Sequence, residues 1–182
     1  MRLAATRSLI VMALTVLSGP ASTRAEAADP AGVNFLQDAT DAPVALRKAI
    51  SGPIMVYKLT LSKVSAEVDV QDSAKKENID RYEYDHGGFG KPRPVTMRGR
   101  YTQKDLDAAV FPLESIDFSL VPKMIADAQQ LLAMPDGKTN ALFLENGRAH
   151  KKPYWHVGVT DDRHHGAVTY DLKGRKLSTF KK

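Results

Sequence analysis

The stretch YWHVGVTDDRHHGAVTYDL, residues 154–172, carries the clearest fold signal in the chain. Every second residue from Trp155 to Val159 is apolar, which is the period of a strand with one buried face. The run at 167–172 is rich in apolar residues again, and Asp161 and its polar neighbours between the two runs favour a turn. The stretch therefore predicts an antiparallel hairpin that turns Trp155 toward the core.

Similar patterns continue on both sides of this hairpin. Helical spacing is found at 44–50 and in the stretch after Ser119, which we expect to cap the second helix. We expect strands, with Val64 facing the core, at residues 54–61, 64–71, 79–86 and 95–101 before a connector at 111–116, and at 139–145, 154–160, 167–172 and 176–180 after it. This order predicts an α+β fold of two helix-plus-antiparallel-sheet repeats packed together, each sheet burying one face under its own helix.

The first residues have the pattern of a secretory signal peptide. Arginines precede an apolar run, and Ala25-Glu26-Ala27 forms a small-x-small cleavage site. A cleavable signal predicts a periplasmic or secreted protein, and no later segment has the roughly 18 apolar residues of a membrane-spanning helix. The expected organisation is a signal peptide at 1–27, a first α+β repeat with an N-terminal arm at 28–110, and a second α+β repeat at 111–182.

Composition excludes several classes of protein. The chain has 182 residues, of which 43% are hydrophobic and 26% charged, so it is neither disordered nor fibrous. Its formal net charge of +5 is too small and too dispersed to predict a nucleic-acid partner. It contains no cysteine, which excludes disulfides, thiolate metal sites, a cysteine nucleophile and a lipid-modified cysteine.

The hairpin and its closing turn resemble a known kind of domain. Trp155-x-Val157-x-Val159, a polar turn and then Gly166-Ala167-Val168-Thr169-Tyr170-Asp171-x-x-Gly174 are similar to the ending of PepSY-like and beta-lactamase-inhibitor-like exported domains. The likeness covers residues 119–177, about a third of the chain. It implies an exported, non-catalytic module of the cell envelope that binds or restrains a protein partner, and it transfers no site residue.

Basic and aromatic residues gather in sequence at the start of the 154–160 strand. We expect them to form a patch that meets a protein partner, with Arg163 lying across the hairpin from the others. The candidate partner-binding residues are Arg148, Lys151, Lys152, Tyr154 and Arg163.

The late histidines suggest an alternative function. Neutral imidazoles are common ligands of transition metals, so His156, His164 and His165 would be the ligands if the protein were a small periplasmic metal-binding protein. Adjacent residues in an extended turn point apart, which weighs against His164 and His165 sharing one ion.

Catalysis has little support in the sequence. The chain has no Gly-x-Ser-x-Gly elbow, Ser-x-x-Lys or His-Glu-x-x-His motif, and no glycine-rich phosphate loop that opens a helix. A hydrolase is therefore the more distant alternative, and we predict no cofactor. The leading hypothesis is a non-enzymatic binding or regulatory module that acts on a protein partner through a sheet face or a hairpin.

Overall fold

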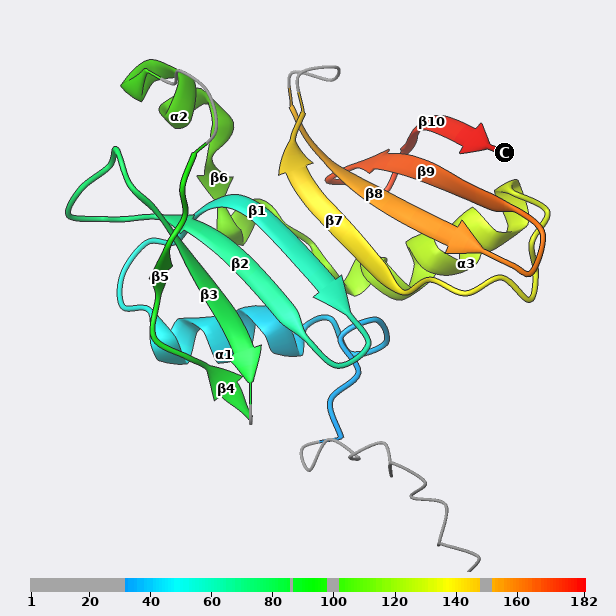
Figure 1. Cartoon of the computed structure of the whole chain (residues 1–182), viewed down its shortest axis with the longest axis horizontal. Coiled ribbons are helices and arrows are strands. Elements are labelled where there is room, and N and C mark those ends of the chain that lie inside the picture. The colour runs from blue at the N-terminus through cyan, green and yellow to red at the C-terminus, as the bar shows by residue number, and fades with distance from the viewer. Residues whose placement is uncertain (1–31, 86, 98–101, 148–151) are drawn as a thin grey trace, which may run out of the picture.

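The computed structural model describes residues 32–85, 87–97, 102–147 and 152–182, in which the two longer helices lie on one side of a long antiparallel sheet (Figure 1). The helices are α1 (Asp41–Ala49), α2 (Gln103–Ala109) and α3 (Val121–Leu131), with 3₁₀ turns η1 (Leu113–Ser115) and η2 (Phe118–Leu120). The strands are β1 (Met55–Ser62), β2 (Ala66–Gln71), β3 (Ile79–Asp85), β4 (Gly88–Phe89), β5 (Arg93–Pro94), β6 (Phe111–Pro112), β7 (Ala141–Asn146), β8 (Pro153–Thr160), β9 (His165–Asp171) and β10 (Lys176–Lys181).

The sheet is continuous across the two halves of the chain. Its strand order is β10-β9-β8-β7-β1-β2-β3-β4, with β5 and β6 pairing beside β3 and β1. Strands β1 and β7, the first long strands of the two halves, pair at the centre of the sheet. There Leu59 lies opposite Leu144, and Leu61 lies opposite Leu142. The predicted α+β class is confirmed, but the expected pair of separate sheets is replaced by one. Pairing β1 with β7 satisfies the backbone groups that two separate sheets would each leave unpaired at an edge.

Both long helices pack on the same face of this sheet (Figure 1). Helix α1 buries Leu46, and α3 buries Met124 and Ala128. Alternate strand residues such as Leu59 and Trp155 point into the same core and are no more than 1% exposed. Among the described residues, Figure 1 shows no helix over the other face of β7, β8 and β9. In the described ranges, no helix has both the length and the apolar character needed to cross a membrane.

The motif that closes the hairpin has a conformational role. Gly174 has a φ of +72°, a value that favours glycine, in the turn between β9 and β10. The Oδ1 atom of Asp171 accepts hydrogen bonds from the backbone N–H groups of Lys173 at 2.9 Å and Arg175 at 3.0 Å. The Asp-x-x-Gly sequence is therefore an Asx-type turn that starts β10.

Two strand predictions extend too far. Val64 was expected to face the core but is 58% exposed, because the turn between β1 and β2 includes it. That turn is held by Ser62 Oγ, which accepts a hydrogen bond from the N–H of Ser65 at 3.0 Å. Of the strand expected at 95–101, residues 95–97 are not in a strand and residues 98–101 lie outside the described ranges. The residues of this region that pair with β3 are Arg93–Pro94, just before the expected strand.

The helix starts also differ from the expectation. The cap predicted at Ser119 is wrong, because Asp117 Oδ1 accepts from both the N–H and the hydroxyl of Ser119, at 3.0 and 2.6 Å. Helix α3 begins two residues later, at Val121. Helix α2 was not predicted, although Thr102 and Asp105 form a capping box at its start.

Candidate functional site

The structure separates the residues of the predicted basic patch. Lys152 precedes β8 and Tyr154 lies near its start, whereas Arg163 follows its end. Eight strand residues at about 3.3 Å each place Arg163 roughly 26 Å from Lys152 along the strand. Arg163 therefore does not lie beside Lys152 and Tyr154, because the β8–β9 turn is at the opposite end of β8 from these two residues. Arg148 and Lys151 lie outside the described residues.

The three candidate metal ligands also lie apart. His156 pairs with Thr169, which is four residues further along β9 than His165, a separation of about 13 Å. His164 lies in the turn, where its Nδ1 atom is 3.2 Å from Asp161 Oδ1. Among the described residues, no group of three or more His, Cys, Asp or Glu side chains could hold a metal ion. The histidines are therefore not arranged as one chelating set.

The face of the sheet opposite α1 and α3 has a charged half on β2, β3 and β5. Asp69 is 4% exposed and accepts two hydrogen bonds from Arg81, from Nε at 2.7 Å and from Nη2 at 3.0 Å. The hydrogen bond to Asp69 is the main cause that raises the pKa of Arg81 above its usual value. Arg81 also lies 3.3 Å from Glu67, and Arg93 pairs with Glu83. The charges on this half thus largely satisfy one another.

The other half of the same face, on β7 to β10, carries aromatic rings. We call Phe143, Tyr154, His156 and Phe180 the aromatic face. Phe143 and His156 are cross-strand partners whose ring centroids are 6.2 Å apart, and Phe180 is 56% exposed. Between these rings the strands place small or short residues: Gly158, Ala167 and Thr169. The aromatic face is therefore a half-exposed surface, and the small side chains between its rings leave that surface shallow.

Strand alternation explains why the rings point away from the core. Leu142 and Leu144 are fully buried on the helix side of β7, so Phe143 between them must point to the other side. Phe180 lies opposite Ala167, and Ala167 lies opposite Gly158, which puts all three on the same face. The sequence analysis did not single out Phe143 or Phe180, although the alternation in the predicted strands contains this signal.

A polar group joins the aromatic face to the charged half. Tyr154 Oη donates to Glu145 Oε1 at 3.4 Å, and Lys58 Nζ lies 3.8 Å from Glu145 Oε2. The same Lys58 ammonium is 5.5 Å from the ring centroid of Phe143. Burial, followed by the charge of Glu145, raises the pKa of Tyr154 above its ordinary value. Glu145 therefore holds a hydroxyl and an ammonium group beside the rings at this edge of the face.

Comparison with known proteins finds a similar fold but does not assign the chain to a family. No protein-family model and no curated protein matches the chain. The crystal structure of a predicted lipoprotein from Clostridium difficile 630 is similar to it, with a TM-score of 0.54 and 14% sequence identity. The match covers 83% of this chain and 94% of that chain. At this identity, the likeness describes the fold.

Proposed function

We propose that this protein is an exported, non-enzymatic binding module of the cell envelope, and that it acts on a protein partner through the aromatic face. The observation that carries the proposal is the uncovered half of the sheet, where Phe143 and Phe180 are turned away from a core that already contains Trp155 and Tyr170. Aromatic residues are enriched in protein interfaces and in the hot spots that dominate binding energy. A strand is also a rigid support for such contacts.

The PepSY-like repeat architecture belongs to the same proposal. The strand order is symmetric about the central β1–β7 pair, with the next strands of each half following outward on either side. A helix precedes each set of strands, α1 before β1 and α3 before β7. These features support two related repeats, and the resemblance of residues 119–177 supports a module that acts by binding.

Location in the envelope is supported by two observations of different kinds. The signal-like pattern at residues 1–27 lies outside the described ranges and rests on the sequence. The similar fold belongs to a predicted lipoprotein, but this chain contains no cysteine to carry a lipid. We therefore propose a protein released into the periplasm or the medium by cleavage of the signal, as distinct from one held by a lipidated cysteine.

We expect the exported protein to begin at Ala28, within a few residues, because cleavage follows the Ala25-Glu26-Ala27 pattern. Expression of the full chain, followed by intact-mass measurement of the protein in the periplasmic and culture fractions, would show this N-terminus. Replacing Ala25 and Ala27 with bulky residues should retain the uncut form. Recovery of the folded protein with Met1 still attached would contradict export by cleavage.

We expect Phe180→Ser and Phe143→Ser each to weaken capture of the partner by about 30-fold, the effect of losing an interface hot spot worth about 2 kcal/mol. The protein, tagged at a site away from the face, would be used to capture proteins from envelope extract, and the affinity of the purified partner would then be measured for each variant. Val44→Ser is the matched control, because Val44 is also 56% exposed but lies on α1.

Thermal melts of all three variants would show that they remain folded. Equal loss of binding in Val44→Ser and Phe180→Ser would mean that general surface hydrophobicity, rather than the aromatic face, captures the partner. Unchanged binding in both phenylalanine variants would exclude this face as the interface.

A further inference from the structure

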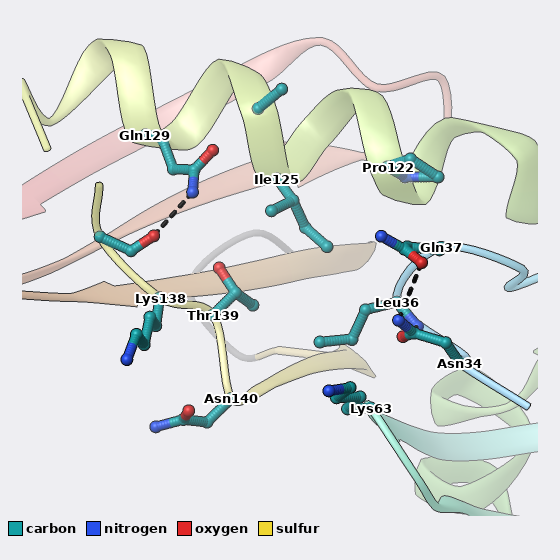
Figure 2. Close-up of a pocket in the computed structure, with 12 residues that line it drawn as sticks. Asn34, Leu36, Gln37, Lys63, Pro122, Ile125, Gln129, Lys138, Thr139 and Asn140 are labelled. Atoms are coloured by element: carbon teal, nitrogen blue, oxygen red, sulfur yellow. Dashed lines mark hydrogen bonds between the residues drawn. The ribbon is translucent and has the colours of Figure 1, made fainter. Parts of the chain in front are cut away.

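A cleft of about 570 Å³ lies where the two halves of the chain meet, and it shares no residue with the aromatic face (Figure 2). Its walls come from four segments: the N-terminal arm before α1, the β1–β2 turn, helix α3 and the connection from α3 to β7. Sites that bind small molecules commonly have volumes of about 300–1,000 Å³. The cleft is thus large enough for a small organic ligand.

The walls are fixed by the fold. The backbone N–H of Phe35 donates to the carbonyl oxygen of Lys63 at 3.2 Å, which ties the arm to the β1–β2 turn. Phe35 itself is fully buried. On the other side, Gln129 Nε2 donates to the carbonyl oxygen of Gly137 at 2.6 Å, which ties α3 to the connection that follows it. The cleft is therefore formed before any ligand arrives.

One side of the cleft is apolar. Leu36 from the arm and Ile125 from α3 are both half-buried, and Figure 2 shows their side chains pointing into the space between the arm and the helix. Pro122 and Ala126 extend this surface along α3. An acyl chain or another apolar body would lose water-exposed surface on entering here.

The rim opposite carries positive charge. Lys63 and Lys138 line the cleft, both side chains are exposed, and no aspartate or glutamate is among the lining residues. Within the described part of the chain, neither lysine takes part in an ion pair. Two lysines in a lining that includes no aspartate or glutamate favour an anion.

Neutral polar groups lie between the apolar side and the lysines. Asn34 Nδ2 donates to Gln37 Oε1 at 3.0 Å, and Asn140 lies beside Thr139 in Figure 2. The Oγ1 atom of Thr139 is buried and has no hydrogen-bond partner among the described groups. Buried hydroxyls are nearly always paired, so Thr139 leaves one hydrogen-bonding group unsatisfied in the cleft wall.

We propose that this cleft binds a small amphipathic anion, a molecule with an apolar body and a carboxylate or similar acidic head group. The apolar body lies against Leu36 and Ile125, and the head group lies near Lys63 and Lys138. The proposal does not depend on the protein-binding function of the aromatic face, because the two sites have different residues. It adds a small-molecule ligand to a protein proposed to bind another protein.

The test uses octanoate and octanamide, which have the same apolar chain and differ in charge. The probes would be titrated into residues 28–182 and followed by NMR through the side-chain methyl groups of Leu36 and Ile125. We expect octanoate to shift these methyl signals with saturation, and octanamide to bind at least about tenfold more weakly. The Lys63→Met, Lys138→Met double variant should lose this preference for the anion.

The control variant is the Lys48→Met, Lys176→Met double variant, which removes two exposed lysines that do not line the cleft. It has the same net charge as the first double variant, and we expect it to bind octanoate as the unmodified protein does. Ala126→Phe, a change at an exposed cleft position on α3, should block both probes.

Several results would overturn the proposal. These are equal binding of octanoate and octanamide, equal loss of binding in the two lysine double variants, and methyl shifts that persist in Ala126→Phe. An absence of saturable shifts at Leu36 and Ile125 with octanoate in the unmodified protein would overturn it as well. Because none of these variants changes the aromatic face, failure here would leave partner capture intact, and the two proposals can fail separately.

Discussion

Replacing Trp155 with alanine should lower the free energy of unfolding by about 3–5 kcal/mol, the usual loss when a buried aromatic side chain is truncated. Trp155 is fully buried, lies between Leu144 and Tyr170 in the sheet, and packs edge-on against Phe118 with ring centroids 6.2 Å apart. Its Nε1 atom has no hydrogen-bond partner among the described groups, so the loss comes from packing. Domains of this kind are stable by only about 5–15 kcal/mol.

Chemical denaturation followed by circular dichroism would measure this change. Trp155→Phe is the informative control, since it keeps a ring in the same position and should cost clearly less than the alanine variant. An alanine variant with an unchanged midpoint of unfolding would mean that Trp155 is a surface residue, and the central role given to the β7–β9 region would be wrong.

The sequence predicts the strands of this region well because strand alternation is a local property. The strands predicted at 154–160 and 167–172 are within two residues of β8 and β9, and Trp155 is buried as expected. The same local pattern places Phe143 and Phe180 on the outer face once the strands around them are known. The sequence does not show which side of the sheet the helices cover. For that reason it could not show that the face with Phe143 and Phe180 is left uncovered.

Pairing between distant segments could not be predicted in the same way. The contact between β1 and β7 joins residues that are 79 to 87 positions apart in the chain, and nothing in either strand specifies which edge will pair. The position of Arg163 relative to Lys152 depended on which end of β8 each residue occupied. The cleft likewise depends on that central junction, which brings segments as distant as Lys63 and Lys138 to the same cleft, so it has no signal in the sequence alone.

The N-terminal arm is the clearest case in which burial was not predicted. Phe35 and Leu36 form a lone apolar pair in a polar stretch, without the periodicity that indicates a helix or strand. In the structure, Phe35 is fully buried and its ring packs edge-on against Tyr84, with centroids 4.8 Å apart. One anchoring side chain therefore fastens a segment that lacks regular structure.

Phe35→Ala should consequently cost about 3–5 kcal/mol, close to the loss expected for Trp155→Ala, although it lies outside every helix and strand. The adjacent Leu36→Ala, at a half-buried position, is the control and should cost clearly less. Denaturant unfolding would compare the two losses of stability. Hydrogen exchange would measure the protection of the backbone amide at position 35, which donates to the carbonyl oxygen of Lys63 in the intact fold. That amide should lose protection when the ring is removed, because the ring holds the arm beside the β1–β2 turn. Equal, small losses in the two variants would show that the arm is not anchored by Phe35, and the cleft would then lack one of its fixed walls.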